Sequence, residues 1–568
     1  MKILGISCFY HDGAAALIMD GKLIAAAEEE RFSRVKHDSN FPEKSINFCL
    51  ETANIKPADL DYIVFYEKPF LKFERLTLTF LATTPRARKS FIDAYQTWFK
   101  DKLWIKSKIA SKLKVPIKKI VFSGHHISHG ASSFYCSPFE KAAILTSDGV
   151  GEWTTTAWGQ GNKNKMRLSS EIKFPHSLGL FYSAFTQFLG FEINEGEYKV
   201  MGLAPFGKPI YTDRVEKLIS QSKDGSFKLN LKYFNFHISE AESFTKEFIK
   251  LFGVPPVNPR ESDKVKQVYA DIAASAQKVL EDKLVTIAKY IQKKTKDENL
   301  VYAGGVALNG VANWRIFKES GFKNIYIHPA AGDSGGALGA AFYFYHHVLG
   351  NKRNFEMRNV YWGRQNTDDE IEKYLDSKKI KHKKYKKGQL GKFIAKKLAE
   401  GKVVGWVRGR FEWGPRALGS RSILADPRNQ EMKDIVNSKI KFREGFRPFA
   451  PVTLIEFGDK YFDVKKPFQK PLEFMLMVVP VKKKWRKSLG AITHVDGTAR
   501  PQFITKEINL EYYNLIKEFG KITGIPVLLN TSFNLKGEPI VNSCEEAYTT
   551  FMRSGLDILV LENYVIEK

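Results

Sequence analysis

Histidines are concentrated in the segment Gly-His125-His126-Ile-Ser-His129-Gly, directly after the apolar-rich segment Ile120-Val-Phe-Ser. His125 and His129 are four positions apart, so on a helix both imidazoles lie on one face, close enough to hold one metal ion. The zinc-protease motif with this spacing has Glu directly after the first His, but His126 stands there, which argues against a metalloprotease. We expect His126 to point away from the shared face and to be structural. The pair therefore needs carboxylate ligands from elsewhere in the chain.

Two aspartates are candidates for these carboxylate ligands. Asp148 lies in Ser147-Asp-Gly149 and Asp333 in Gly332-Asp-Ser, both in Gly-flanked turns after predicted strands, where carboxylates project into a cleft. Imidazole and carboxylate ligands with open positions suit Fe(II), Mn(II) or Zn(II). The alternative is that Asp-Gly is an ordinary turn and that the His pair is a hydrogen-bonded surface pair.

Two further polar residues lie near the first predicted turn. His11 and Lys36 could hold an anionic or carbonyl oxygen, and His11 could also move a proton. The competing interpretation is that Arg31, Arg34 and Lys36 form a solvated basic strand edge.

The elements that must position these residues have an internal repeat. Residues 2–7 and 14–19 read as strands joined through Asp12-Gly13, and residues 142–146 and 154–158 repeat the pattern through Asp148-Gly149. Two such units indicate a duplicated pair of lobes whose backbone amides face a phosphate-bearing ligand. This pattern is typical of the actin and sugar-kinase (ASKHA) superfamily and predicts an α/β fold.

A glycine-rich turn follows later in the same half of the chain. Residues 262–295 have a long helical pattern, and the strand candidate from Leu300 then enters a turn containing Gly304, Gly305 and Asn309. Such a turn lets the backbone approach a nucleotide closely, although many strand–helix turns carry two glycines.

The composition changes after residue 350. We predict a first domain over 1–350, a linker or connecting segment over 351–388, which is polar and basic, and a second α/β domain over 389–568. The second domain opens with a helix that ends at Gly401.

The second domain places cations beside rigid Pro and Gly turns and among Phe, Trp and Leu. This arrangement orients guanidinium groups for phosphate or carboxylate, and neutral donors at a strand end add to it. The alternative, surface arginine, fits poorly with these apolar neighbours. The candidate residues are Arg416, Lys441, Arg447, Arg500, Asn530 and Ser532.

Composition limits the classes of protein. The chain has 568 residues, too many for one core, and 43% hydrophobic residues, as in globular proteins. Its four cysteines are scattered, and we find neither a signal-peptide core nor a run of 18 apolar residues, so we expect a cytoplasmic protein without disulfides or a membrane span. The net charge of +27 invites polyanions, but the lysine clusters lack interleaved aromatics, which favours a solvated surface.

Motifs along nearly the whole chain resemble one family. The segments FYHDGAAAL, EEERFSRVKHD, HHISHGASS, SDGVGE, EYKVMGLAPFG, YAGGVALNG and AAGDSGGALGAA resemble the amino-terminal domain of the NodU/CmcH-type O-carbamoyltransferases. The segments WGPRALGSRSIL, FRPFAP, HVDGTAR and LLNTSFNLKGEPIV resemble their carboxy-terminal domain. Local departures are Ser420, where Asn is common, and Cys544, where Pro is common.

The resemblance implies two active centres. A YrdC-like carboxy-terminal domain would use Mg-ATP and carbamoyl phosphate to make carbamoyl-adenylate and pyrophosphate. The amino-terminal domain would transfer the carbamoyl group to an acceptor hydroxyl with help from bound iron. Matched by motif, the metal site is His125, His129, Asp148 and Asp333, the residues around the transferred group are His11 and Lys36, the nucleoside-binding turn is Gly304, Gly305 and Asn309, and the phosphate and nucleotide pocket is Arg416, Lys441, Arg447, Arg500, Asn530 and Ser532.

The expected acceptor is a small-molecule or glycan hydroxyl, and nucleic acid is not expected as a partner. Oligomeric state stays open, with a homodimer among the options. One alternative is a tRNA threonylcarbamoyladenosine-type enzyme, which the +27 charge favours but the motifs from GPRALG onward oppose. Another is an ATPase or chaperone with an actin-like core, which leaves the His/Asp set unexplained.

Overall fold

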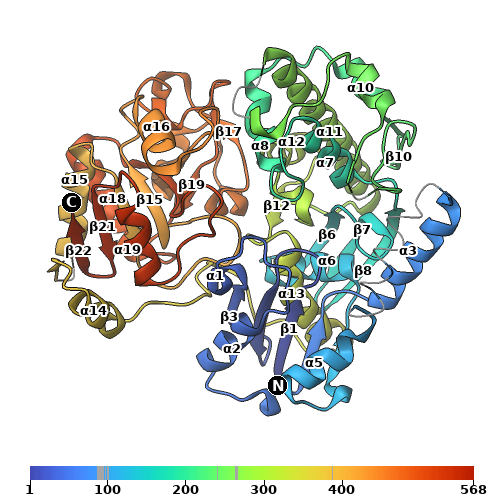
Figure 1. Ribbon diagram of the computed structural model, residues 1–568, viewed down its shortest axis with the longest axis horizontal. Coiled ribbons are helices and arrows are strands. Elements are labelled where there is room, and N and C mark those ends of the chain that lie inside the picture. The colour runs from blue at the N-terminus through green and yellow to red at the C-terminus, as the bar shows by residue number, and fades with distance from the viewer. Residues whose placement is uncertain (86–94, 96–97, 99–101, 240, 262–265, 387) are drawn as a thin grey trace. The chain divides into compact units, whose positions relative to one another are not determined.

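The computed structural model describes residues 1–85, 95, 98, 102–239, 241–261, 266–386 and 388–568 (Figure 1). Its internal contacts divide the chain into two compact units. The first unit comprises Met1–Ala26 and Ser39–Glu356, and the second comprises Ala27–Asp38 and Met357–Lys568. A short segment near the N-terminus therefore belongs with the C-terminal residues, which differs from the domain limits expected from the sequence.

The first sheet of unit 1 has the strand order β3-β2-β1-β4-β5. β1 pairs with β2 in antiparallel and with β4 in parallel orientation, and β4 pairs with β5 in parallel orientation. The strands are β1 (Lys2–Ser7), β2 (Ala14–Met19), β3 (Lys22–Glu28), β4 (Tyr62–Phe65) and β5 (Ile120–Phe122).

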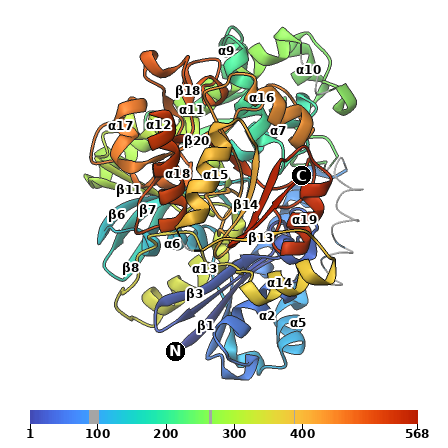
Figure 2. The same cartoon turned by 90° about the vertical axis from the view of Figure 1, so that its left-hand side faces the viewer.

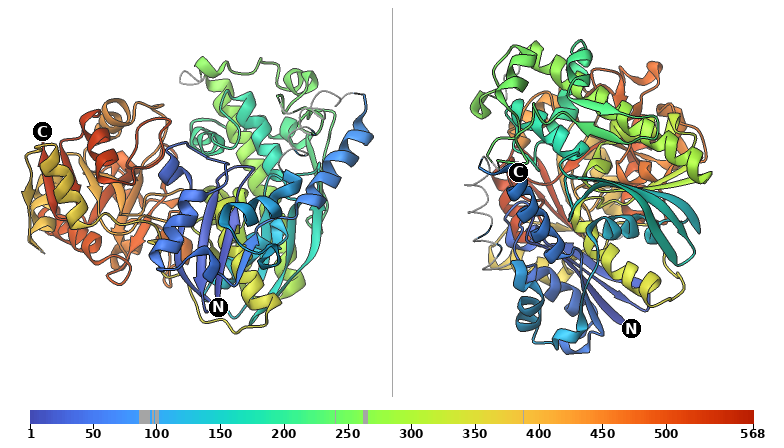
Figure 3. Two further views of the ribbon diagram at one scale, coloured as in Figure 1. Left: turned by 60° about the horizontal axis from the view of Figure 1, so that its bottom comes forward. Right: turned by 90° about the vertical axis from the view of Figure 1, so that its right-hand side faces the viewer.

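The second sheet of unit 1 repeats this topology with the order β12-β11-β6-β7-β8. β6, β7 and β8 pair in antiparallel orientation, and β6, β11 and β12 pair in parallel orientation, so β6 occupies the place of β1. The right view of Figure 3 shows the teal strands of this sheet side by side. The repeat confirms the predicted duplicated α/β domain. The strands are β6 (Lys141–Ser147), β7 (Thr154–Asn162), β8 (Lys165–Lys173), β11 (Asn299–Ala303) and β12 (Asn324–Ile327).

Two helices of unit 1 pack against each other, and each of them packs on one of the two sheets. α6 (His125–Cys136) packs on β6, β7 and β11, α13 (Asp333–Phe342) packs on β1, β2 and β4, and the two helices pack on each other. Small residues in α13 permit this contact, because a Cβ atom at Gly339 would lie only 1.8 Å from the carbonyl oxygen of Ser128 in α6. The first turns of both helices thereby come together.

The remaining helices of unit 1 include the long helix predicted from the sequence, which is α11 (Gln267–Thr295); residues 262–265 of that prediction lie outside the described residues. α7, α8, α9 and α12 all pack on α11. These and the other helices and strands of the unit are α2 (Glu43–Thr52), α3 (Pro69–Thr83), α5 (Ile105–Leu113), α7 (Leu178–Phe188), α8 (Glu197–Leu203), α9 (Thr212–Glu216), β9 (Ile219–Gln221), β10 (Phe227–Leu229), α10 (Lys246–Phe252) and α12 (Gly310–Glu319).

Unit 2 is built on a mixed sheet with the order β13-β22-β21-β14-β15-β20-β16-β19. β14 pairs with β21 in parallel and with β15 in antiparallel orientation. This sheet confirms the predicted second α/β domain, while its YrdC-like character stays a prediction. The strands are β13 (Lys383–Lys384), β14 (Val404–Val407), β15 (Arg421–Ala425), β16 (Ala450–Leu454), β19 (Gln502–Ile504), β20 (Val527–Ser532), β21 (Ile558–Leu561) and β22 (Tyr564–Glu567).

Helices α15 (Gln389–Ala399) and α18 (Leu510–Thr523) lie side by side on this sheet (Figure 2). Ile394 of α15 and Phe519 of α18 are fully buried in one apolar cluster with strand residues such as Leu424 and Val560. α19 (Cys544–Met552) packs on β14 and β21. α15 ends as predicted, with Gly401 in the left-handed conformation just beyond it.

The segment 351–388, predicted as a linker or connecting segment, has secondary structure of its own. It contains α14 (Asp368–Ser377), which has a capping box at Thr367, and β13, which pairs with β22. Residues 357–388, except residue 387, which lies outside the described residues, therefore belong to unit 2. None of the described helices is long and apolar enough to cross a membrane.

Candidate active sites

The histidine pair lies in the first turns of α6, as its spacing predicts. His125 and His129 are 1% and 0% exposed. The Glu152 carboxylate accepts the backbone N–H of His125 at 3.0 Å, which satisfies a free donor at the helix N-terminus. His126 is buried on another side, where its Nδ1 lies 2.7 Å from Thr146 Oγ1, in agreement with a structural role.

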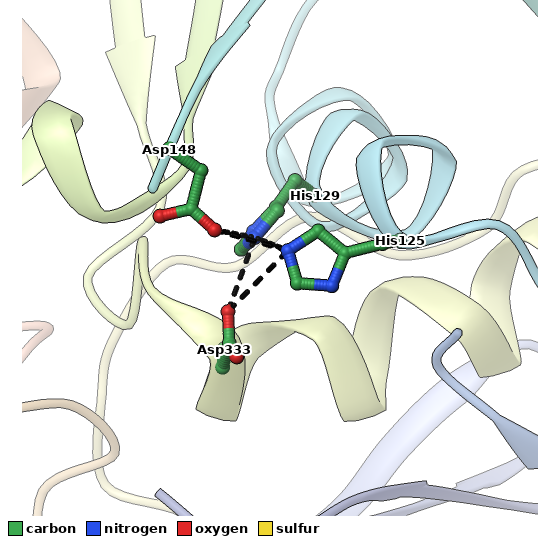
Figure 4. Close-up of side chains that lie close together, drawn as sticks. All are labelled: His125, His129, Asp148 and Asp333. Atoms are coloured by element: carbon green, nitrogen blue, oxygen red, sulfur yellow. Dashed lines mark hydrogen bonds and ion pairs between the residues drawn. The ribbon is translucent and has the colours of Figure 1, made fainter. Parts of the chain in front are cut away.

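The structure brings the predicted metal ligands together (Figure 4). Nε2 of His125 and Nε2 of His129 are 3.1 Å apart, and Asp148 Oδ2 lies 3.0 and 3.2 Å from them. Asp333 Oδ1 lies 3.6 Å from His125 Nε2 and 3.3 Å from His129 Nε2. All four potential ligand atoms lie within 4.8 Å of one another.

Opposite charges stabilise one another in this buried group. Burial alone would lower the pKa of His125, but Asp333 and Asp148 raise it well above its usual value. Burial alone would raise the pKa of Asp148, but hydrogen bonds from His125 and His129 hold it well below its usual range. The carboxylates therefore stay ionised, which is the form that binds a cation.

The donor set fits a divalent transition metal. Two imidazole nitrogens and two carboxylate oxygens are the ligands that Fe(II), Mn(II) and Zn(II) accept. The Nε2 atoms of His125 and His129 face each other at 3.1 Å, so protons on both would point at one another, whereas a metal ion would take the place of these protons. Asp333 Oδ1 is buried, and among the described residues it has ion-pair contacts to the two Nε2 atoms but no hydrogen bond of good geometry. A cation between these atoms would satisfy all of them.

The glycine-rich turn lies against Asp148. The Gly305 N–H donates to Asp148 Oδ1 at 2.9 Å, and Gly304 has φ of +97°. A Cβ atom on Gly304 would lie 2.1 Å from the Ser147 carbonyl oxygen, so only glycine fits there. Asn309 caps α12 through Ala312 N–H. The observed contacts of this turn therefore orient a carboxylate, and its predicted role in nucleotide binding stays a prediction.

His11 also lies at this group. Its Nε2 is 3.9 Å from Asp333 Oδ2 and its Nδ1 is 3.0 Å from Asp12 Oδ2. Burial alone would lower the pKa of His11, but Asp333 and Asp12 raise it to about 9. An imidazolium therefore stands beside the candidate metal centre.

Two residues of this site were missed from the sequence. Tyr66 and Glu67 directly follow β4, and the Tyr66 hydroxyl donates to Asp333 Oδ2 at 3.3 Å, while Glu67 Oε2 lies 3.8 Å from His125 Nδ1. The available signal was their position, because polar residues at the carboxyl end of a parallel strand face the site in α/β sheets.

Lys36, predicted to act with His11, belongs to unit 2. Its segment packs there through Arg31, which donates to the Gly414 carbonyl at 2.9 Å, and through Glu28, which accepts the Gly414 N–H at 2.9 Å. Arg34 donates to the Ile540 carbonyl at 2.6 Å. The ammonium group of Lys36 is close enough to Lys441 to lower the pKa of Lys441.

Unit 2 gathers the predicted cations into one cluster. Partial burial, and the repulsion of Arg416, Arg443 and Arg447, hold the pKa of Arg500 well below its usual value. Arg500 Nε has no hydrogen-bond partner among the described residues. Clustered guanidinium groups repel one another unless an anion lies between them, so this cluster suits a phosphate-bearing ligand.

Lys441 is the most buried of this cluster's predicted cations, with 3% of its surface exposed. Its ammonium donates to the carbonyl oxygens of Ser532 and Asn534, both at 2.8 Å, and to Asn534 Oδ1 at 2.6 Å. Burial and the charges of Arg443, Arg447 and Lys36 hold its pKa well below the usual value. Lys441 thus joins the end of β20 to the cations.

The loop that carries Arg416 is held from within unit 2. Glu412, which is 2% exposed, accepts the backbone N–H groups of Leu418 and Ser420 at 2.8 and 2.7 Å. Asn530 donates to the Ala417 carbonyl at 3.1 Å. Asn530 therefore has a visible positioning role, and Glu412 is a further residue that sequence reasoning missed.

The fold and its side chains define a two-unit α/β protein with a candidate metal centre in one unit and a cation cluster in the other. Residues 2–342 match the family described as "Carbamoyltransferase N-terminus", and residues 395–568 match "Carbamoyltransferase C-terminus". The chain belongs to the carbamoyltransferase family and is an enzyme.

Two of the relatives match over nearly the whole chain, and a third matches over less than half of it. An uncharacterized protein of Synechocystis sp. is 46% identical over 100% of this chain and 96% of its own length. The nodulation protein NolNO of Sinorhizobium fredii is 37% identical over 99% of this chain and 79% of its own length. The 3'-hydroxymethylcephem-O-carbamoyltransferase of Streptomyces clavuligerus is 32% identical over 45% of this chain and 46% of its own length. These matches place the chain in the NodU/CmcH-type branch.

Proposed function

We propose that this carbamoyltransferase is an ATP-dependent O-carbamoyltransferase that works in two steps. In the first, unit 2 converts carbamoyl phosphate, water and ATP to carbamoyl-adenylate, pyrophosphate and phosphate: water displaces carbamate from phosphate, and the carbamate oxygen attacks the α-phosphorus of ATP as pyrophosphate leaves. In the second, unit 1 transfers the carbamoyl group to an acceptor hydroxyl, which loses its proton as AMP leaves.

One observation carries this division of labour: the two units hold chemically different sites. Unit 1 gathers His125, His129, Asp148 and Asp333, and unit 2 gathers guanidinium and ammonium groups. The cation cluster suits the polyphosphate chemistry of adenylation, and the imidazole–carboxylate group suits activation of a carbonyl.

In unit 2 the proposed work is electrostatic. Arg416, Arg447 and Arg500 would bind the phosphates of ATP and carbamoyl phosphate and offset the negative charge on the phosphoryl group during its transfer. Lys441 would hold the end of β20, and Asn530 would hold the loop that carries Arg416. Both segments would then stay in position to contact the substrate. Ser532 would add a neutral hydroxyl at the same strand end.

In unit 1 the residues would bind and orient the carbamoyl group. A divalent metal, Fe(II) or else Mn(II) or Zn(II), would be held by His125, His129, Asp148 and Asp333 and supplies Lewis-acid chemistry, which polarises a carbonyl. His11 would keep its proton at neutral pH and donate a hydrogen bond to an anionic oxygen of carbamoyl-adenylate. Gly304, Gly305 and Asn309 would line the approach of the adenosine moiety.

The acceptor would be a hydroxyl of a small molecule or glycan. The relative from Streptomyces clavuligerus is named for a hydroxymethylcephem acceptor, and that acceptor is said of the relative alone. An activated carbamoyl group is readily lost to water, so the acceptor has to exclude water as it binds.

The test of the proposal is the release of pyrophosphate. With Mg-ATP and carbamoyl phosphate the protein should release pyrophosphate and form carbamoyl-adenylate, with or without Fe(II). Pyrophosphate release that requires threonine and bicarbonate instead would favour the tRNA-modifying alternative, since that product contains threonine. ATP hydrolysis to ADP alone would contradict both.

Two variants test the division of labour. Arg447→Ala should lower the rate of carbamoyl-adenylate formation by about 100-fold, as loss of one preorganised charge donor does. His129→Ala should leave that rate unchanged but stop carbamoyl transfer. If both variants fail at the same step, the assignment of the two steps to the two units is wrong.

A further inference from the structure

We infer that Tyr66 and Glu67, the two residues directly after β4, are positioning residues that orient two ligands of the proposed metal centre, Asp333 and His125. The inference rests on the proposed function, because it needs a metal at this group. Both residues contact ligand atoms that do not face the proposed metal, and neither was among the candidates from the sequence.

Tyr66 is fixed in place by its backbone and its ring. Its N–H donates to the Ile6 carbonyl at 3.1 Å, and its carbonyl accepts the Ser128 hydroxyl of α6 at 2.8 Å. Its side chain is fully buried, and a Cβ atom at Gly336 of α13 would lie 2.9 Å from the ring. The phenol therefore stands rigidly between β1, α6 and α13.

This rigid phenol selects one oxygen of Asp333. The Tyr66 hydroxyl donates to Oδ2 at 3.3 Å, which leaves Oδ1 facing the Nε2 atoms of His129 and His125 at 3.3 and 3.6 Å. A carboxylate with one oxygen held in this way cannot rotate freely, so its other oxygen stays aimed at the centre. Asp148 has the same arrangement, since the Gly305 N–H holds Oδ1 and leaves Oδ2 to the histidines.

Glu67 faces the outer nitrogen of His125. Its Oε2 lies 3.8 Å from Nδ1 and 2.8 Å from Lys72 Nζ, and both Glu67 and Lys72 are almost fully buried. The short contact with the Lys72 ammonium pairs Glu67 with a cation, as expected for a buried carboxylate. A carboxylate beside Nδ1 favours the tautomer with its proton there, which leaves the Nε2 lone pair free for a metal.

The competing explanation is that the Lys72–Glu67 pair serves only folding. A buried ion pair of that kind would affect stability, but removing it would not change metal affinity in a folded protein. The two explanations therefore separate when metal affinity is measured on variants whose folding is also measured.

The experiment titrates metal-free full-length protein with Co(II) and follows the visible absorption of the bound ion. Tyr66→Phe and Glu67→Gln should each weaken Co(II) binding by about 10- to 100-fold, the usual effect of losing a partner behind a metal ligand. Glu67→Asp, which keeps the charge, should restore part of the affinity. Altered intensity or position of the absorption bands in Glu67→Gln would report a changed ligand geometry.

Two control variants make matched changes elsewhere in unit 1. Tyr135→Phe removes a buried hydroxyl that donates to the Asn164 carbonyl, and Asp297→Asn removes a buried carboxylate that pairs with Lys141 at 2.7 Å. Both should bind Co(II) like the wild type. Thermal unfolding shows whether each variant is folded, and pyrophosphate release by unit 2 should match that of the wild type in every variant.

The outcomes separate the two levels of the proposal. If the wild type binds Co(II) but folded Tyr66→Phe and Glu67→Gln bind it equally well, the positioning roles are wrong and the metal centre stands. If the wild type and His129→Ala bind Co(II) equally weakly, the metal centre itself is wrong, and the inference falls with it. If the two controls weaken binding as much as the site variants, the effect is one of folding and the positioning roles are again wrong.

Discussion

His125 and His129 each face two carboxylates, whereas Arg500 lies among Arg416, Arg443 and Arg447. The first arrangement balances charge within the protein and is organised before a ligand arrives. In the second arrangement like charges repel one another, and a bound polyanion would reduce that repulsion. Binding of a polyanion should therefore stabilise the folded state of unit 2.

Stability of the protein should depend on pH through His328, which follows β12 and is fully buried. Burial lowers its pKa to about 4, and its Nδ1 accepts the Ala330 N–H. Below the unfolded-state pKa of 6.5 the unfolded chain binds a proton that the folded chain does not, so stability falls as the pH falls towards 4. The loss is about 1.4 kcal/mol per pH unit, or about 3 kcal/mol in total.

The variant His328→Asn should remove this dependence, since the Asn side chain can still accept the Ala330 N–H but does not titrate. Urea unfolding at pH 7 and pH 4.5 measures it. The free energy of unfolding of the variant should fall less over this interval than that of the wild type. An equal fall in both proteins would contradict the assignment.

Residue types near the site were predictable to different degrees. His125 and His129 follow from a local spacing, and Asp148 and Asp333 from turns after strands. Tyr66 and Glu67 carry no local signal of their own, because their partners lie on α13 and α6. Lys36 is predicted to lie around the transferred group; its segment makes its contacts in unit 2, and its role stays a prediction.

At the scale of elements, the packing of α13 decides where Asp333 lies. A Cβ atom at Gly339 would lie 1.8 Å from the Ser128 carbonyl oxygen, and one at Gly5 would lie 1.8 Å from the Ala337 carbonyl oxygen. α13 therefore contacts β1 on one side and α6 on another through backbone atoms. This close packing sets the first residue of α13 against the first turns of α6.

Gly339→Ala should destabilise unit 1, because the methyl group meets backbone that cannot move aside cheaply. The expected loss is about 1–3 kcal/mol or more, as for other overpacked interiors. Urea unfolding measures the loss, and Co(II) binding should weaken as α13 shifts away from α6.

Gly332→Ala is the matched control for Gly339→Ala. A Cβ atom there meets nothing within 4 Å, and its φ of −76° suits alanine. It should cost about 1 kcal/mol or less, through the poorer N-cap alone. Equal destabilisation by both variants would show that the contact between α13 and α6 is not what Gly339 protects.

At the scale of the whole molecule, neither unit is one continuous stretch of the chain. Residues 27–38 leave unit 1 and contribute to unit 2 before the chain returns at residue 39. Arg31 is 4% exposed and joins Glu28, Glu30 and the Gly414 carbonyl. This segment therefore supports the loop on which Arg416 stands.

Arg31→Ala should destabilise unit 2, although most residues near it in sequence belong to unit 1. Loss of the guanidinium leaves Glu28 buried without its cation, which costs about 3–5 kcal/mol. Hydrogen exchange followed by mass spectrometry should become faster in peptides of 404–425 and stay unchanged in peptides of 141–162.

The matched control is Arg75→Ala, which removes a buried guanidinium from unit 1. Arg75 donates to the Gly151 carbonyl at 2.7 Å. It should speed exchange in peptides around residues 148–154 and leave peptides of 404–425 unchanged. If Arg31→Ala instead speeds exchange in unit 1, the assignment of residues 27–38 to unit 2 is wrong.

Local patterns determined the repeated strand units, the helix with His125 and His129 on one face, and the end of α15 at Gly401, because hydrogen bonds between near neighbours govern all three. The mixed sheet of unit 2 was predicted only as a class, since pairing of strands far apart in sequence has no local signature. Only the tertiary structure decided which oxygen of Asp333 faces the histidines, that Tyr66 and Glu67 stand behind two ligands, and that Lys36 belongs to unit 2. The physical reason is that close backbone packing, as at Gly339, sets distances between segments that periodicity and turn signals leave open.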